Sequence, residues 1–155
     1  MNAGSIGIIF LSAAKVTLRT IVISLSIASV ASASTSQELQ VHVDLSDQSM
    51  AVTLDGEAIY YWPVSTGTVG YSTPTGVFHP IRMHETWYSR KYDGVPMPNS
   101  IFFFGGYAIH GTLDTRNLGR PASRGCVRLH PENAKVLFDL VKKRGLSRTE
   151  IILHQ

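Results

Sequence analysis

Cys126 is the only cysteine among the 155 residues, and it lies in the segment Ser123–Arg128, which reads SRGCVR. A single thiol cannot form an internal disulfide, so it is either a buried apolar group or a reactive one. His110 lies sixteen residues earlier in the chain. An imidazole in the same domain can convert a weakly nucleophilic thiol into a thiolate. The two residues together predict a cysteine nucleophile with a histidine base.

Basic residues surround this pair in the sequence. Only one acid, Asp114, lies between His110 and Leu129, where the chain carries four arginines, namely Arg116, Arg120, Arg124 and Arg128. Nearby cations lower the pKa of a thiol and attract anions. We therefore expect Arg124, Arg128 and His110 to lower the pKa of Cys126 and the site to accept an anionic substrate. The alternative is a solvated, arginine-rich loop.

Strand patterns dominate the segments that must position these residues. Apolar and polar residues alternate from Leu39 to Leu45 and again from Met50 to Leu54, as in half-buried strands. Asp55-Gly56 marks a hairpin turn into a third strand over residues 58–64. Further short strands are predicted at Val77–Phe78, Ile101–Phe104, Tyr107–His110 and Ile151–Leu153. The pattern predicts a mainly β fold.

One helix is predicted near the C-terminal end. Pro131 suits a first helical position, and apolar residues then follow helical spacing at Ala134, Leu137, Phe138 and Val141. Three basic residues favour the last turn, and Gly145 can end the helix.

The segment from Trp87 to Asn99 predicts a long loop, because it contains two prolines and an Asp-Gly pair. Its aromatic residues, Trp87, Tyr88 and Tyr92, allow three roles: stacking on a sugar, covering a bound peptide, or packing within the loop. The sequence leaves these open.

The N-terminal residues predict an export signal. Lys15 and Arg19 precede the uncharged, mostly apolar stretch Thr20–Val30, and Ala31-Ser32-Ala33 suits a signal peptidase. We therefore expect residues 1–33 to be a cleavable signal peptide and residues 34–155 to be one domain, exported to the periplasm. Cleavage removes two of the 14 basic residues and leaves 11 acidic ones, a formal charge of +1. The sequence pI of about 9.2 is thus no argument for binding nucleic acid.

A longer set of motifs closely resembles the catalytic signature of the L,D-transpeptidases, the YkuD-type domain. The matching segments are His110-Gly111-Thr112, Ser123–Leu129, Pro131–Ala134, Ser65-Thr66-Gly67 and Thr73–Phe78. The resemblance spans roughly Leu39 to Leu153. It implies a mixed β-sandwich or barrel with one clear helix, and an enzyme that forms peptide crosslinks in bacterial peptidoglycan.

The resemblance also implies roles for individual residues. Cys126 would be the nucleophile, His110 the general base and acid, and Gly111 would orient His110 through its carbonyl oxygen. Amides around Gly125 and Cys126 would form the oxyanion hole, and Ser123 and Arg128 would shape the donor site. Arg124 stands where many family members have His, so the substrate-binding role expected for it rests on its own charge and not on the resemblance. No metal or other cofactor is required.

The implied reaction is acyl transfer from a tetrapeptide stem through a Cys126 thioester, with loss of D-alanine. The acceptor would be a second stem, giving a 3-3 crosslink, or an outer-membrane protein; a D-amino acid or water are the other possibilities. With water, the protein would be a peptidoglycan hydrolase using the same Cys-His site. A third alternative is a non-catalytic periplasmic module that binds peptidoglycan. We expect a monomer, stem peptides as its partners, no nucleic acid, and acylation by carbapenems.

Overall fold

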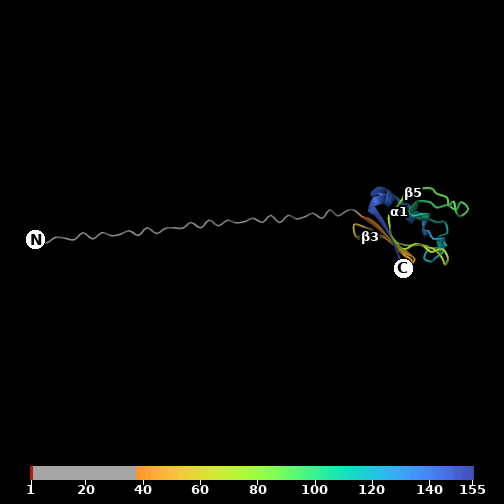
Figure 1. Ribbon diagram of the computed structural model, residues 1–155, viewed down its shortest axis with the longest axis horizontal. Coiled ribbons are helices and arrows are strands. Elements are labelled where there is room, and N and C mark those ends of the chain that lie inside the picture. The colour runs from red at the N-terminus through yellow and green to blue at the C-terminus, as the bar shows by residue number, and fades with distance from the viewer. Residues whose placement is uncertain (2–37) are drawn as a thin grey trace. The chain divides into compact units, whose positions relative to one another are not determined.

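Two β-sheets and one α-helix form the framework of the part of the chain that the computed structural model describes, namely residue 1 and residues 38–155 (Figure 1). The predicted signal peptide and its cleavage site after Ala33 lie outside the described residues, apart from Met1. Within the described part, no helix is both long and apolar enough to cross a membrane.

The first sheet has five strands in the order β3-β2-β1-β9-β4. Their bounds are β1 Leu39–Asp44, β2 Ser49–Leu54, β3 Glu57–Pro63, β4 Gly76–Phe78 and β9 Thr149–His154. β2 and β3 form the hairpin predicted at Asp55-Gly56, with Leu54 opposite Glu57, and β1 pairs with β2 on the other side. β9 runs parallel to β1, with Leu39 opposite Thr149, whereas the other pairings are antiparallel. The sheet is therefore mixed, as expected.

The second sheet has four strands in the order β5-β6-β7-β8. Their bounds are β5 Arg82–His84, β6 Ser100–Phe104, β7 Tyr107–Gly111 and β8 Val127–Leu129. β6 and β7, both predicted as strands, form an antiparallel pair, and β8 lies parallel to β7. β5 and β8 were not predicted. Each has only three residues, and neither contains a pair of adjacent strand-favouring apolar residues such as the Val77-Phe78 of the equally short β4.

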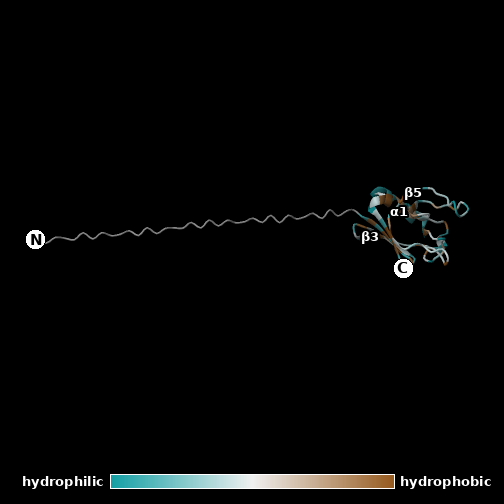
Figure 2. Cartoon of the chain, in the orientation of Figure 1, coloured by the Kyte–Doolittle hydropathy of each residue, from teal (hydrophilic) through white to brown (hydrophobic). Residues whose placement is uncertain are grey.

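The predicted helix is confirmed as α1, Pro131–Arg144. It begins with Pro131, buries the four predicted apolar residues, and is followed by Gly145 at a positive φ of 96°. Figure 2 shows hydrophobic residues on the strands and on the inner side of α1, and hydrophilic ones on its outer turns. Two short 3₁₀-helices, η1 Thr115–Asn117 and η2 Leu146–Arg148, complete the described elements.

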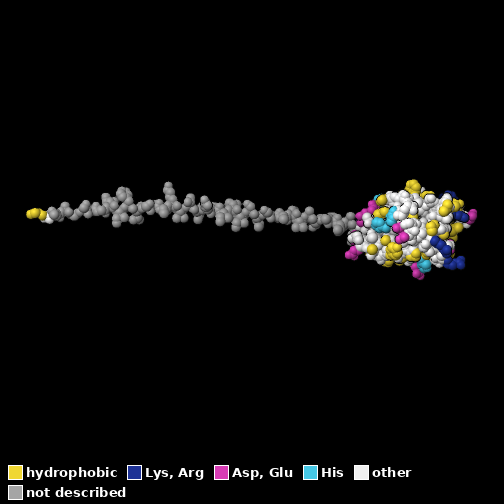
Figure 3. Space-filling view, turned by 90° about the horizontal axis from the view of Figure 1, so that it is seen from below, with side chains coloured by type: hydrophobic (Ala, Val, Ile, Leu, Met, Phe, Trp, Pro, Cys, Tyr) yellow, Lys and Arg dark blue, Asp and Glu magenta, His cyan; other side chains and the backbone are white. Residues whose placement is uncertain are grey.

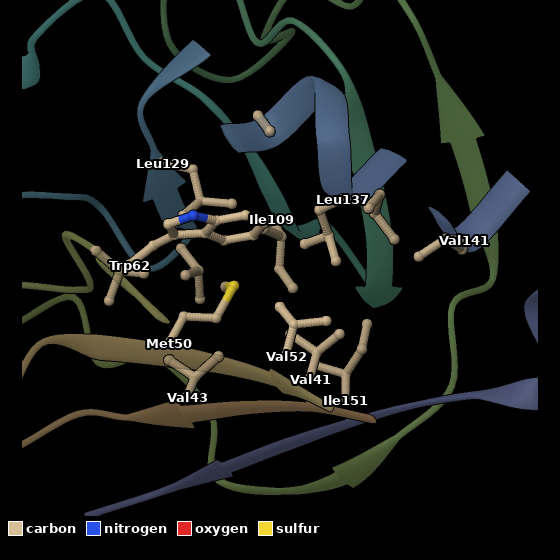
Figure 4. Close-up of a cluster of buried hydrophobic side chains, with 14 of the residues drawn as sticks. Val41, Val43, Met50, Val52, Trp62, Ile109, Leu129, Leu137, Val141 and Ile151 are labelled. Atoms are coloured by element: carbon tan, nitrogen blue, oxygen red, sulfur yellow. The ribbon is translucent and has the colours of Figure 1, made fainter. Parts of the chain in front are cut away.

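The core lies between the first sheet on one side and α1 with the second sheet on the other (Figure 4). Side chains from β1, β2 and β9 face those from β7, β8 and α1; those labelled in the figure include Val41, Val52, Ile151, Ile109, Leu129 and Leu137. Burying such a side chain fully stabilises the fold by about 1.5–3 kcal/mol. The two sheets form a sandwich and no closed barrel, so the sandwich form of the expected fold is the correct one.

The second sheet has a different environment on each face. Ile109 and Val127 point into the core, and both are almost completely buried. Neighbouring residues along a strand point to opposite faces, so Ala108 and His110 face away from the core. This outer face of the second sheet carries the candidate site.

Candidate active site

A cavity of about 600 Å³ opens over the outer face of the second sheet. Five of the residues predicted for the site line it: His110, Ser123, Arg124, Cys126 and Arg128. The remaining lining residues come from β5, β6, β7 and the loop that follows β5, namely Arg82, Trp87, Ser89, Arg90, Lys91, Tyr92, Val95, Met97, Phe102, Gly106 and Tyr107. The predicted loop over residues 87–99 is therefore a wall of the cavity.

Parallel pairing of β7 with β8 brings the predicted nucleophile and base together. His110 lies opposite Arg128 in the ladder, and Ile109 lies opposite Val127. Cys126 directly precedes β8 and lines the same cavity as His110 and Arg128, while Val127 is fully buried in the core. Val127 therefore points into the core, and its two neighbours share the other face. Two residues that are sixteen positions apart in the sequence thus lie on the same face of neighbouring chain segments.

His110 is held in one orientation by its own backbone neighbour. Its Nδ1 lies 2.7 Å from the Gly111 carbonyl oxygen. A carbonyl only accepts hydrogen bonds, so Nδ1 carries the proton and Nε2 of the neutral ring is free to take one. The side chain is only 5% exposed. Burial lowers the pKa of His110 from about 6.5 to about 4, assisted by the Arg128 charge and opposed by the Gly111 hydrogen bond.

Gly111 has no room for a side chain. A Cβ at this position would lie 3.1 Å from the Pro98 ring and 3.2 Å from the Pro131 backbone. Its own N–H donates to the Pro98 carbonyl. The start of α1 and the end of the 87–99 loop therefore fix the carbonyl that orients His110.

The Cys126 thiol is partly exposed in the cavity and packs against an apolar cluster of Met97, Phe102 and Ala108. Burial raises the pKa of Cys126, although the Ala108 N–H and the Arg128 charge both lower it. The expected lowering of this pKa is wrong for the substrate-free protein. The physical reason is that the apolar cluster removes water from the thiol, and this outweighs the cation.

The resting pair is therefore a neutral thiol beside a neutral imidazole at neutral pH. Such a pair becomes nucleophilic when the thiol proton passes to Nε2 of His110 during attack on a carbonyl carbon. Arg128 lies on the same face and favours the thiolate that this transfer creates. The arrangement suits acyl transfer through a thioester.

Ser123 fixes the loop that carries the thiol. Its buried hydroxyl donates to the Cys126 carbonyl, 2.6 Å away, and accepts the Gly125 N–H at 3.0 Å. The Gly125 amide is thus already engaged in this structure. Of the two amides expected in an oxyanion hole, that of Cys126 remains the stronger candidate.

A second clamp holds this loop from the segment before β4. The Thr73 hydroxyl donates to the Gly125 carbonyl at 2.8 Å and accepts the Gly67 N–H at 2.9 Å. Gly125 itself has a φ of +112°, and a Cβ there would lie 2.6 Å from the Tyr107 ring. Only glycine fits this conformation and this contact. The family-like turn at residues 73–78 therefore supports the nucleophile directly.

Ser123→Ala is expected to lower stability and to slow acylation of Cys126. The variant leaves the buried Gly125 N–H and the Cys126 carbonyl without their hydroxyl partner, which costs about 1–3 kcal/mol. Thermal unfolding and the rate of Cys126 acylation measure the two effects. Ser46→Ala is a matched control, because that hydroxyl is exposed and bonds only to Asp44. Equal acylation rates in the two variants would show that the Ser123 hydroxyl does not position the thiol.

The four predicted arginines divide into two pairs. Arg128 is half-buried, donates to the Ala122 carbonyl at 3.3 Å, and lies 3.8 Å from Asp114. Arg124 is exposed at the cavity and lies over the Tyr92 ring, 4.6 Å from its centre. Arg116 and Arg120 are exposed and do not line the cavity. Of the four arginines expected to form a basic patch, only Arg124 and Arg128 therefore line the cavity.

Several residues of the site were not predicted from the sequence. Phe102 and Met97 form the apolar floor beneath Cys126, Tyr107 covers Gly125, and Arg82 extends the cavity to β5. The strand register offers a signal that could have located Phe102. Phe102 pairs with Ala108, and Ala108 has the same parity along β7 as His110, so a correct strand register would have placed both on the outer face.

Similarity to known proteins identifies the family of this chain. The sequence model of the YkuD family, described as the L,D-transpeptidase catalytic domain, matches residues 38–151. The chain belongs to this family. Among curated proteins, the YkuD-family relative in Bacillus subtilis, named as a candidate L,D-transpeptidase, is 25% identical over 101 residues, which cover 64% of this chain and 58% of the relative.

Solved structures of L,D-transpeptidases share the YkuD-family fold of this chain. One from Stackebrandtia nassauensis matches with a TM-score of 0.67 and 30% identity, covering 76% of this chain and 56% of the other. One from Mycobacterium smegmatis matches with a TM-score of 0.68 and 23% identity, covering 76% and 59%. The chain thus spans less than two thirds of the length of these relatives.

Proposed function

We propose that this protein is a cysteine-dependent L,D-transpeptidase that acts on peptidoglycan tetrapeptide stems. The observation that carries the proposal is the shared placement of Cys126 and His110. His110 on β7 and Cys126 directly before the parallel strand β8 line one cavity, and the Gly111 carbonyl leaves Nε2 of His110 free to accept the thiol proton. Membership of the L,D-transpeptidase family supplies the reaction class.

The first half-reaction forms a thioester. The Cys126 proton passes to Nε2 of His110 while the sulfur attacks the carbonyl carbon at the L-centre of the diamino acid. The tetrahedral intermediate then collapses, and His110 returns the proton to the departing amine of D-alanine. General acid-base assistance of this kind contributes about 10²–10⁴-fold to a rate.

The second half-reaction resolves the thioester. An acceptor amine attacks the same carbonyl carbon, gives a proton to His110, and releases Cys126, whose sulfur recovers that proton. A side-chain amine on a second stem gives a 3-3 crosslink, and an amine on an outer-membrane protein gives an attached protein. We propose that the enzyme acts in the periplasm as a monomer, and the export signal predicted over residues 1–33 supports that location.

Incubation with a purified disaccharide tetrapeptide, followed by mass spectrometry, tests the proposal. A dimer that has lost one D-alanine supports transpeptidation. Tripeptide alone would show that water resolves the thioester, so that the enzyme is a hydrolase using the same site. Unchanged substrate would indicate a non-catalytic binding module. The Cys126→Ala protein is the control, because it lacks the sulfur that forms the thioester.

Arg128→Lys is expected to slow acylation by a stem-peptide donor nearly as much as Arg128→Gln. Lysine keeps the charge but loses the planar fork that bonds a carboxylate in two places. Hydrogen bonds to charged groups are worth about 1.5–3 kcal/mol, so the expected loss is about 10- to 100-fold. Rapid-mixing kinetics with intact-protein mass detection measures it. Arg120→Lys is the control, since Arg120 is exposed and lies outside the cavity lining. Wild-type rates for Arg128→Lys would reduce Arg128 to a generic positive charge.

A further inference from the structure

The cavity wall is strongly cationic. No aspartate or glutamate lines it, whereas five basic side chains do, namely Arg82, Arg90, Lys91, Arg124 and Arg128. Among the described residues, only Arg128 of these five forms a salt bridge, with Asp114. On the face shown in Figure 3, Lys and Arg side chains gather mainly at one end of the domain. The charge in the cavity is thus left available to a ligand.

Aromatic rings hold two of these cations at the β5 side of the cavity. The Arg82 guanidinium lies 3.9 Å from the centre of the Phe102 ring and 5.8 Å from that of Trp87. The Arg90 guanidinium lies 5.3 Å from the centre of the Trp87 ring. A guanidinium stacked on a ring keeps the N–H groups at its edge free for a planar, bidentate partner. The nearby acid Glu85 is occupied by Lys142 of α1.

The same rings connect these arginines to the thiol. Phe102 belongs to the apolar cluster beneath Cys126, and Trp87 packs against that cluster from the loop. Arg82 pairs with Phe102 in the β5–β6 ladder, so the two side chains lie on one face of the sheet. Arg82 and Cys126 therefore both pack on one continuous apolar surface that includes Phe102.

Strand order sets the distance between the two cationic ends of the cavity. Arg82 lies on β5 and Arg128 on β8, with β6 and β7 between them. Three strand spacings of about 4.8 Å place these strands about 14 Å apart. An extended peptide covers that distance in about four residues. A group bound at Arg82 is therefore remote from the carbonyl that Cys126 attacks.

We infer that Arg82 and Arg90, stacked on Phe102 and Trp87, form a second carboxylate subsite that binds a carboxylate of the stem peptide remote from the reacting bond. The identity of the peptide rests on the proposed function. The subsite makes the enzyme selective for stems whose side carboxylates are free, and against stems in which they are carboxamides. A carboxamide has no charge and offers only one acceptor oxygen to the guanidinium fork.

Binding to the Cys126→Ala protein tests the subsite without any chemistry. Calorimetry compares a tetrapeptide stem with all carboxylates free and the same peptide with its carboxylates other than the C-terminal one amidated. The Arg82→Gln/Arg90→Gln double variant, made in the same background, is expected to bind the free form about tenfold more weakly and the amidated form unchanged. The matched control is Arg116→Gln/Arg120→Gln, which removes two exposed charges outside the cavity.

Two kinetic arms on the Cys126-containing protein assign the carboxylate to its source. If the double variant is slower only in forming the thioester, the carboxylate belongs to the donor peptide. If it is slower only in transferring the acyl group from a preformed thioester, the carboxylate belongs to the acceptor. Equal discrimination between the two peptides by wild-type and double-variant proteins would overturn the subsite, as would an equal loss in the control variant. Failure of the proposed function looks different: the free peptide would then bind without ever acylating Cys126.

Discussion

Cys126→Ala and Cys126→Ser variants are expected to retain the fold and to form no covalent acyl-enzyme. Alanine has no nucleophile, and a serine hydroxyl has a far higher pKa than a thiol. The histidine that serves Cys126 is a weak base, because burial lowers its pKa to about 4. Such a base can assist a thiol during attack but is poorly matched to a hydroxyl. The expected effect is complete loss of the acylated species.

Intact-protein mass spectrometry after incubation with a carbapenem measures this loss directly. A solved L,D-transpeptidase with a TM-score of 0.67 to this chain was determined in complex with imipenem, which makes that compound a suitable probe. Thermal unfolding of each variant is the control for folding. An imipenem adduct on the folded alanine variant would disprove Cys126 as the nucleophile.

His110→Gln and His110→Ala are expected to slow acylation by about 10²–10⁴-fold. Neither replacement can take the thiol proton, and neither can return a proton to the departing amine. In the wild-type protein, the pKa of His110 is lowered to about 4, so Nε2 is mostly unprotonated from about pH 5 upward. The acylation rate should therefore fall on acidification only near pH 4, rather than near the ordinary histidine value of about 6.5.

The pH dependence of stability separates the catalytic role of His110 from a structural one. Its folded pKa lies below the unfolded value, so the unfolded chain binds the additional proton between pH 6.5 and 4. Stability is accordingly lost as the pH falls through this window, by up to about 3 kcal/mol below it. His110→Gln should remove this component and leave neutral-pH stability nearly unchanged. Full activity in the variant would show that another group serves as base.

The predicted part of the fold rests on patterns that are local in sequence. Alternation from Leu39 to Leu45 and helical spacing after Pro131 each report a buried face within one element, and both elements were found. β5 and β8 left no such signal, because their three residues become strands only by pairing with β6 and β7. Their existence depends on neighbours that lie elsewhere in the chain.

The features of the candidate site were likewise predictable only where their signal is local in the sequence. Cys126, His110 and Gly111 were identifiable because their residue types and motif carry the chemistry. The raised pKa of Cys126 was not, because it comes from burial against Met97 and Phe102, which lie on other segments. The clamp by Thr73 likewise joins residues 52 positions apart. Dehydration and long-range hydrogen bonds are properties of the assembled cavity and have no local pattern.

The apolar floor beneath Cys126 also has a consequence for damage by oxidants. Oxidation to sulfenic and higher acids proceeds through the thiolate, and the folded, substrate-free protein keeps this thiol protonated. No second cysteine exists in the sequence to rescue an oxidised sulfur as an internal disulfide. Folding therefore shields the single sulfur when no peptide is bound. The thiol becomes reactive when a carbonyl carbon is in place and the proton can move to His110.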